Sequence, residues 1–309
     1  MNIDVNENNI PLQKIEAEFL NKKDIKFYVL REDLIHSEIS GNKWRKLKYN
    51  ITEAKEKGAE TVLTFGGAFS NHIAATAAAG NVFGIKTIGI IRGEEKLPLN
   101  PTLQLAKDNG MHFKYVSREM YRNKNEIPFI NELKSEFGAV YVIPEGGSNA
   151  FAVKGCTEII DNINIEYDVI CCACGTGGTI AGIISSTNKQ VLGFPALKGG
   201  EFLIEDIQQL LLKYEEKFNK ETENTSWKLI TDYHFGGYAK IKPELVDFVK
   251  AFKTENKIEL DLIYTGKMLF GLYDMIQTSN QFDGKTIIVV HTGGIQGNKG
   301  FKDRFGIEI

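Results

Sequence analysis

Lys43 stands in the run Ser-Gly-Asn-Lys-Trp-Arg-Lys-Leu, which covers residues 40–47. The Ser-Gly-Asn segment is typical of a turn, and the residues after it predict a helix from 43 to about 57. A lysine at a helix start, close to Arg45 and Lys46, is disfavoured as a cation by the helix dipole and by its neighbours. The neutral amine is the form that makes a Schiff base with a carbonyl compound. Taken alone, the pattern is also typical of a solvated surface lysine.

A second candidate segment reads Gly-Gly-Ala-Phe-Ser-Asn-His over residues 66–72. It lies between an apolar run, 61–65, and an alanine-rich stretch that predicts a helix. The Ser70 hydroxyl, the Asn71 amide and free backbone N–H groups would converge there and could hold an anion. The alternative for Ser70 is an ordinary helix N-cap. A serine hydrolase is disfavoured, because Ser70 lacks the Gly-x-Ser-x-Gly elbow.

A glycine-rich loop, Gly-Thr-Gly-Gly-Thr at 175–179, follows a predicted buried strand at 169–174 and precedes a predicted helix. This order of strand, loop and helix is one that holds a phosphate monoester. A dinucleotide fingerprint would need glycine or alanine at position 180, which is Ile180, and an acidic residue after the next strand. A Walker-type loop would need Gly-Lys-Ser/Thr, and none follows.

Together these segments resemble the pyridoxal-phosphate enzymes of the tryptophan-synthase-β type, and within them the D-cysteine desulfhydrase / 1-aminocyclopropane-1-carboxylate deaminase family. The family pattern has Gly-Asn-Lys-x-Arg-Lys-Leu, Gly-Gly-x-x-Ser-Asn-His and a glycine-rich loop. It ends with Tyr-(Thr or Glu)-Gly-Lys and His-(Thr or Leu)-Gly-Gly, which are here residues 264–267 and 291–294. All the motifs occur in the family's order, over residues 40–297.

The resemblance implies that the cofactor is pyridoxal 5'-phosphate, and it assigns roles to the matching positions. Lys43 matches the catalytic lysine that binds the cofactor covalently and moves the substrate Cα proton. Asn71 matches the partner of the cofactor's ring hydroxyl, and Ser70 a catalytic hydroxyl near the substrate. The phosphate loop matches Gly175, Thr176, Gly177, Gly178 and Thr179, and the catalytic active-site tyrosines match Tyr238 and Tyr264. The candidate substrate contacts are Asn42, His72 and Thr265, and a further candidate cofactor contact is Thr292.

The choice of Tyr238 rests on its spacing, 26 residues before Tyr264. The residue that follows it is Ala239, where the family usually has glycine.

Two positions bear on the substrate that the resemblance implies. Ring-opening deaminases of the family carry Glu after the tyrosine and Leu after the histidine, whereas desulfhydrase-type members carry a small hydroxyl residue at both. This chain has Thr265 and Thr292. A carboxylate beside the ring nitrogen would make the cofactor a deeper electron sink, and a hydroxyl does so much less.

β-Elimination of D-cysteine to pyruvate, ammonia and hydrogen sulfide is therefore favoured. The alternatives are deamination of 1-aminocyclopropane-1-carboxylate to 2-oxobutyrate and ammonia, and, in another class, an inactive cofactor-binding relative.

Size and charge restrict the remaining possibilities. A chain of 309 residues exceeds what one core usually supports, so two lobes are expected. The net charge of −3 gives no electrostatic reason to bind nucleic acid or an anionic membrane. Residues 1–13 lack a secretory pattern, and no run of about 18 apolar residues could span a bilayer, so a cytoplasmic protein is expected. The resemblance implies a small amino-acid substrate and a homodimer.

Three of the four cysteines, Cys171, Cys172 and Cys174, crowd one apolar strand. A metal site would need a second pair of ligands at suitable spacing, and no such cluster of Cys or His exists. They are predicted to be small buried strand residues, and no metal is expected.

Predicted strands and helices alternate along the chain. The strands are 27–30, 61–65, 87–91, 112–116, 140–143, 169–174, 190–194, 228–231 and 286–291. The helices are 43–57, 71–80, 101–109, 127–137, 151–162, 180–187, 201–221 and 243–255. This predicts a two-domain α/β fold, with parallel sheets that have helices on both faces. Residues 1–40 and 151–309 would form a large cofactor-binding domain and 41–150 a small α/β domain, with the cofactor in the cleft between them.

Two segments depart from the family pattern. Residues 295–298, after Gly294, lack the apolar start that a further helix would need. Residues 194–232 resemble the family poorly and could shape the substrate pocket.

Overall fold

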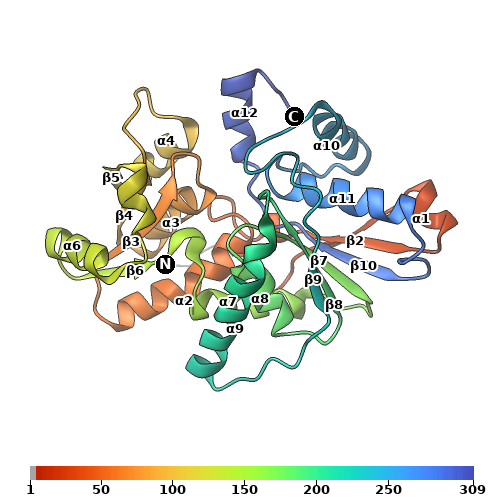
Figure 1. Ribbon diagram of the computed structural model, residues 1–309, viewed down its shortest axis with the longest axis horizontal. Helices are drawn as coiled ribbons and strands as arrows, with labels where there is room; N and C mark the ends of the chain where they lie inside the picture. The colour runs from red at the N-terminus through yellow and green to blue at the C-terminus, as the bar shows by residue number, and fades with distance from the viewer. Residues whose placement is uncertain (1–4) are drawn as a thin grey trace.

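The structure, a computed structural model, describes residues 5–309, in which the strands form two sheets (Figure 1). In spatial order, the larger sheet contains β1 (Leu12–Ile15), β2 (Lys26–Leu30), β10 (Thr286–Val290), β7 (Val169–Cys174), β8 (Gln190–Pro195) and β9 (Trp227–Leu229). The smaller sheet contains β5 (His112–Val116), β4 (Lys86–Arg92), β3 (Thr61–Gly67) and β6 (Val140–Ile143). All neighbouring strands are parallel except β1 and β2. The predicted α/β fold with parallel sheets is confirmed.

The helices connect these strands. They are α1 (Glu18–Lys22), α2 (Asn42–Glu56), α3 (Asn71–Phe83), α4 (Pro101–Asp108), α5 (Arg118–Arg122), α6 (Ile127–Phe137), α7 (Ala150–Thr157), α8 (Gly178–Ile184), α9 (Leu203–Phe218), α10 (Pro243–Asn256), α11 (Thr265–Thr278) and α12 (Gly297–Phe305). Short 3₁₀ helices are η1 (Glu32–Leu34), η2 (Glu145–Gly147), η3 (Ile160–Asn162) and η4 (Gly200–Phe202).

The larger sheet is buried on both faces, and strand β7 illustrates why its residues are all apolar. Because side chains alternate along a strand, one set packs into the core that contains α10 and α11, and the other into the core that contains α7, α8 and α9. Figure 1 shows α10 and α11 above this sheet and α8 and α9 below it. The three strand cysteines are buried with free thiols, as predicted.

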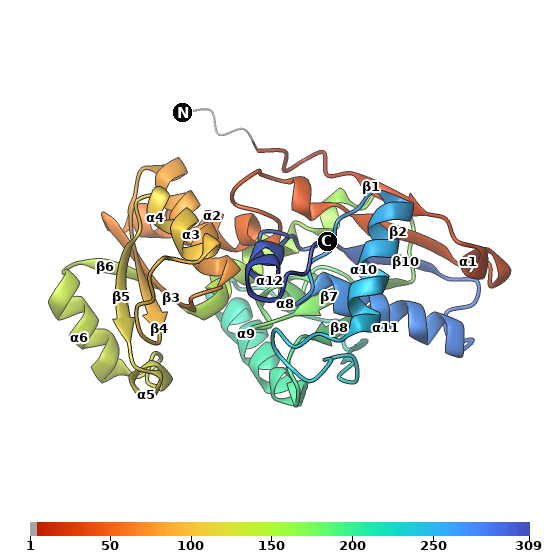
Figure 2. The ribbon, with the colours of Figure 1, turned by 90° about the horizontal axis from the view of Figure 1, so that it is seen from above.

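The smaller sheet has α3 and α4 on one face and α5 and α6 on the other, and it lies to one side of the larger sheet (Figure 2). Its strands fall within residues 61–143, and those of the larger sheet within 12–30 and 169–290. Helix α2 packs against both α3 and α7 and contributes to the same core as α7 to α9. The division into domains at residues 40 and 150 stays a prediction.

The sequence patterns missed β1, the five-residue helices α1 and α5, and the longer helices α11 and α12. Strand β1 is a four-residue antiparallel edge strand, too short for a clear alternation. Helix α11 is buried on most sides, so it lacks the polar face of an amphipathic helix. Residues 295–298 lack an apolar start, yet helix α12 begins at Gly297. Helix α12 is anchored by buried Asn298, which donates to Leu260 O at 3.0 Å and accepts from Leu262 N at 3.3 Å.

A buried ion pair fixes the first turns of α2 to the larger sheet. Arg45 and Glu32 are 1% and 0% exposed, and the guanidinium donates to both carboxylate oxygens, at 3.1 and 3.0 Å. The same guanidinium also donates to Glu158 at 3.2 Å. Since η1, with Glu32, follows β2 directly, this pair holds the start of α2 against the end of that strand.

We predict that Glu32→Gln lowers the free energy of unfolding by about 3 kcal/mol, because it leaves the Arg45 charge buried without its main partner. The matched control is Glu18→Gln, which breaks the exposed pair between Glu18 and Lys22. That change should cost less than about 1 kcal/mol. Urea denaturation of both variants measures the difference, and equal small losses would contradict a structural role for the buried pair.

Candidate active site

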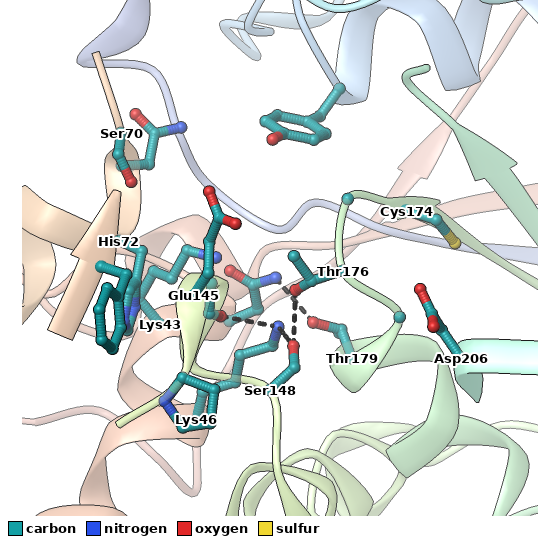
Figure 3. Close-up of a pocket in the computed structure, with 18 of the residues that line it drawn as sticks. Lys43, Lys46, Ser70, His72, Glu145, Ser148, Cys174, Thr176, Thr179 and Asp206 are labelled. Atoms are coloured by element: carbon teal, nitrogen blue, oxygen red, sulfur yellow. Dashed lines mark hydrogen bonds between the residues drawn. The ribbon is translucent and has the colours of Figure 1, made fainter. Parts of the chain in front are cut away.

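A cavity of about 1020 Å³ is lined by residues from both sheets, at the carboxyl ends of their strands. Its walls follow β3, β4, β7 and β10, which is where α/β folds usually bind ligands. Figure 3 shows Lys43, Ser70, Thr176 and Thr179 around this space. Most of the predicted site residues line it: Asn42, Lys43, Ser70, Asn71, His72, Gly175, Thr176, Gly177, Thr179, Tyr238, Tyr264 and Thr292. Gly178 and Thr265 do not.

A tight turn brings Lys43 to the cavity. Gly41 has φ 60° and ψ −139°, a conformation that favours glycine, and a Cβ there would lie 2.0 Å from Thr292 O. The Asn42 N–H donates to the same carbonyl at 3.3 Å, and the Asn42 side chain donates to Thr179 Oγ1 at 2.8 Å. The start of α2 is thereby packed against both the end of β10 and the glycine-rich loop.

Lys43 is partly buried in the cavity wall, and its pKa is lowered to about 7. Burial is the main cause, and the neighbouring Lys46 ammonium adds to it. The neutral amine expected from the sequence is supported, with burial as an additional and larger cause. Of the two neighbours expected to disfavour the cation, Lys46 does so, whereas the charge of Arg45 is balanced by Glu32.

Lys46 lines the cavity one turn after Lys43, and the sequence reasoning assigned it no contact of its own. It is 2% exposed, and its ammonium donates to Gly146 O at 3.1 Å and to Ser148 Oγ at 3.0 Å. The Ser148 hydroxyl also bonds Thr176 Oγ1 at 2.5 Å, and Figure 3 draws these bonds. The three-residue spacing from Lys43, which puts both on one helix face, could have identified Lys46.

Two glycines of the loop leave room for side chains beside the cavity. A Cβ at Gly178 would lie 2.7 Å from Ser148 Oγ and 3.1 Å from Lys46 Nζ. Gly178 does not line the cavity, but the absence of a side chain there leaves room for Ser148 and Lys46 beside it. A Cβ at Gly175 would lie 3.1 Å from the Tyr264 ring. A lysine with neighbouring serine and threonine hydroxyls is a donor set that suits phosphate oxygens.

Ser70, Asn71 and His72 form the opposite wall, where α3 begins. The Ser70 hydroxyl caps α3 by accepting from Ile73 N at 3.3 Å, as in the N-cap alternative. Ser70 also lines the cavity. The Asn71 side-chain oxygen is buried without a hydrogen-bond partner. Such an orphaned polar atom is costly unless a ligand or water satisfies it.

His72 is held neutral in one tautomer. Thr64 Oγ1 donates to Ile143 O at 2.9 Å and therefore has no second proton for His72 Nε2, which lies 2.7 Å away. Nε2 must carry the ring proton, which leaves Nδ1 as an acceptor, buried and without a partner. Burial, with Lys43 and Lys46 nearby, sets the pKa of His72 well below its ordinary value.

Tyr238 and Tyr264 meet at the third wall, with ring centroids 6.2 Å apart and an interplanar angle of 68°. Burial, followed by the neighbouring Tyr238 phenol, raises the pKa of Tyr264 well above its ordinary value. Tyr264 therefore keeps its proton at neutral pH, and its hydroxyl is available to donate a hydrogen bond.

Thr265 does not reach the cavity, contrary to the predicted substrate contact. It is fully buried, and its hydroxyl donates to Asp261 Oδ2 at 2.7 Å and accepts from Asp261 N at 3.0 Å. The hydroxyl thus both donates and accepts a hydrogen bond at the start of α11. Thr265 therefore affects the cavity only through the backbone conformation of this wall.

The residues present fit pyridoxal phosphate. Lys43 supplies a neutral amine for the aldehyde, the cluster around Lys46 supplies phosphate donors, and the orphaned Asn71 amide faces the same space. Within residues 5–309, no group of His, Cys, Asp and Glu could hold a metal ion. No helix in that range is long and apolar enough to cross a membrane.

Comparisons with known proteins agree with this cavity. The family model described as pyridoxal-phosphate-dependent enzyme matches residues 3–293. A candidate 1-aminocyclopropane-1-carboxylate deaminase of Thermotoga maritima is 34% identical over 96% of this chain and 97% of its own length. The bifunctional D-cysteine desulfhydrase/1-aminocyclopropane-1-carboxylate deaminase of Arabidopsis thaliana is 31% identical over 87% of this chain and 72% of its own. The crystal structure of a homologue of that deaminase superposes with a TM-score of 0.83 at 31% identity, over 96% of this chain and 92% of the other. The chain therefore belongs to the pyridoxal-phosphate-dependent enzymes, in the family of 1-aminocyclopropane-1-carboxylate deaminase and D-cysteine desulfhydrase.

Proposed function

We propose that this enzyme catalyses β-elimination from a small D-amino acid that carries a leaving group on Cβ, with D-cysteine as the substrate. With one water consumed, the products are pyruvate, ammonia and hydrogen sulfide. The Cα–H and Cβ–S bonds break, and the amine is finally lost by hydrolysis.

The observation that carries this proposal is the absence of a carboxylate from one cavity wall. Among the described residues that line the cavity, the carboxylates are Glu145 and Asp206. Glu145 is engaged by the Tyr121 hydroxyl at 2.9 Å and by Lys124 at 3.3 Å. The wall formed by Tyr264 and residues 292–296 offers hydroxyl and amide groups instead. A wall without a carboxylate suits a reaction in which departure of sulfide relieves the negative charge.

The cofactor would be held by residues of four segments: α2, α3, the turn between η2 and α7, and the glycine-rich loop with the start of α8. Lys46, Ser148, Thr176 and Thr179 would donate to the phosphate, and Asn71 would bond the ring hydroxyl. When bound, pyridoxal phosphate supplies an electron sink for the charge that develops at Cα.

The chain's own residues would move the protons. Lys43, with its low pKa, would accept the Cα proton, because an amine near neutrality can act as a base at physiological pH. Tyr264, which keeps its proton, would donate to the departing thiolate, with Tyr238 alongside it. Ser70 would orient the substrate from the opposite wall.

The second candidate function is ring opening of 1-aminocyclopropane-1-carboxylate, which the names of the Thermotoga and Arabidopsis relatives favour. That reaction has no leaving group to take the charge, so it needs a deeper electron sink than hydroxyl groups provide. The cytoplasmic location and the homodimer remain predictions.

The low pKa of Lys43 predicts how the cofactor is captured. When cofactor-free protein is mixed with pyridoxal phosphate, the visible absorption band should form about ten times faster at pH 8 than at pH 6 and then level off, because the neutral amine grows only through a pKa of about 7. Stopped-flow absorbance measures the rate. Nα-acetyllysine is the control, since its rate should keep rising above pH 9. The same continued rise for the protein would contradict a lowered pKa.

A substrate panel tests the proposed function. The same preparation receives D-cysteine, L-cysteine, β-chloro-D-alanine and 1-aminocyclopropane-1-carboxylate, and pyruvate, 2-oxobutyrate and sulfide are followed. We expect kcat/KM for D-cysteine to exceed that for the cyclopropane by at least about tenfold, a difference of about 1.4 kcal/mol in activation free energy. Rapid release of 2-oxobutyrate with inert D-cysteine would overturn the proposal in favour of ring opening.

A further inference from the structure

Lys267, the last residue of the Tyr-Thr-Gly-Lys motif, is a buried lysine that the proposed chemistry does not use. It lies in α11 and is 2% exposed. Its ammonium donates to His234 O at 2.9 Å, to Gly237 O at 2.8 Å and to Ala196 O at 3.4 Å. All three N–H donors are thus used by backbone carbonyls, two of them from a single loop.

That loop, residues 232–241, contains no helix or strand and has a strained backbone. Phe235 and Ala239 both have φ 54°, and Gly236 and Gly237 have φ 95° and 122°. Residues other than glycine are disfavoured in this region, so such a loop needs support from outside. Lys267 supplies it by binding two of the loop's carbonyls at one point.

Tyr238 lies in the same loop, directly after Gly237, whose carbonyl Lys267 binds. Its partner Tyr264 stands at the start of α11, three residues before Lys267, and the two rings meet at 6.2 Å. The start of one helix therefore supports both tyrosines. It carries Tyr264 directly, and it reaches Tyr238 through the ammonium of Lys267.

We infer that Lys267 is a positioning residue for Tyr238, whose loop it holds so that the phenol meets Tyr264 at the cavity wall. The inference rests on the proposed function for the role given to Tyr238. It gives a role to the lysine that ends the Tyr-Thr-Gly-Lys motif, a residue to which the family resemblance assigns no contact with cofactor or substrate.

The chemistry of the site supports a charged donor at this position. A buried ammonium is costly, and an apolar side chain of similar length would avoid that cost if the carbonyls needed no donor. Burial lowers the pKa of Lys267 to about 8, and the charge of Asp261 opposes that shift. At neutral pH the group is therefore mainly protonated and keeps three N–H donors.

The first test reads the loop itself, in the cofactor-loaded protein, by hydrogen exchange. Three loop amides are hydrogen bonded: Gly236 N–H to His234 Nδ1 at 2.8 Å, Gly237 N–H to His234 O at 3.0 Å and Lys240 N–H to Gly237 O at 3.1 Å. Lys267→Met should speed their exchange at least about tenfold and leave α8 unchanged, because the carbonyls lose their common donor.

The matched control is Tyr233→Phe. It removes a bond between the same loop and α11, from the Tyr233 hydroxyl to Asp274 Oδ2 at 2.7 Å, on an exposed part of the surface. Its effect on exchange of the three amides should stay below about twofold. An equal effect of both variants would overturn the inference.

The second test is a double-mutant cycle with Tyr238→Phe, measured on the substrate that the panel identifies. Lys267→Met should lower kcat/KM at least about tenfold in the wild-type background but less than about twofold in the Tyr238→Phe background. Equal losses in both backgrounds would show that Lys267 acts independently of Tyr238. Lys267→Gln, which keeps two N–H donors, should fall between wild type and Lys267→Met.

Failure of the inference and failure of the proposed function are distinguishable. If no amino acid in the panel is turned over, the exchange experiment still tests Lys267, and only the proposed function fails. If both Lys267 variants unfold throughout or lose bound cofactor, Lys267 supports the whole fold and the inference is overturned.

Discussion

Three basic residues, Lys43, Arg45 and Lys46, lie within the first turn of helix α2, which packs against both α3 and α7, and the structure has to accommodate their charges. Each charge is handled differently. Arg45 is paired with Glu32, Lys46 donates to a carbonyl and a hydroxyl beside the glycine-rich loop, and the pKa of Lys43 is lowered to about 7. The pKa of Lys43 is lowered mainly by its own burial, and the nearby Lys46 ammonium adds to this effect because like charges repel strongly where water is excluded. The lowered pKa is a consequence of this packing.

The packing in turn depends on a close approach of backbones. Helix α2 can begin at the cavity only because Gly41 lies against the Thr292 carbonyl, where no side chain would fit. This contact joins the end of β10 to helix α2, which leads into β3 of the smaller sheet. It places Lys43 opposite the glycine-rich loop and beside the wall formed by α3. Segments about 250 residues apart in the sequence, 41 and 292, thus form one site.

Much of the fold and of the site could be predicted from the sequence. The strands of both sheets are short apolar runs bounded by turn residues, and this signal is local, so nearly all of them were found. Helix α11 was missed because burial on most sides removes the amphipathic pattern, and α12 because a single buried asparagine, and not an apolar start, anchors it. Most motif residues line the cavity because they follow the carboxyl ends of strands or lie in tight glycine turns, which fix the position of the backbone. Thr265 does not reach the cavity, because its hydroxyl donates to the carboxylate of Asp261, four residues earlier. The motif alone does not indicate this hydrogen bond. The partners of Lys46 and Lys267 come from segments about 30 to 100 residues away, so only the tertiary structure could identify them.

The central claim is that Lys43, and not its buried neighbour Lys46, carries the cofactor. Borohydride reduction of the purified protein, followed by proteolysis and mass spectrometry, tests it directly, because reduction makes the link between lysine and cofactor permanent. The account predicts one modified peptide, with the added mass of a reduced pyridoxal phosphate group on Lys43. Modification of Lys46 or of another lysine instead, or a protein that holds no cofactor after incubation with pyridoxal phosphate, would contradict it.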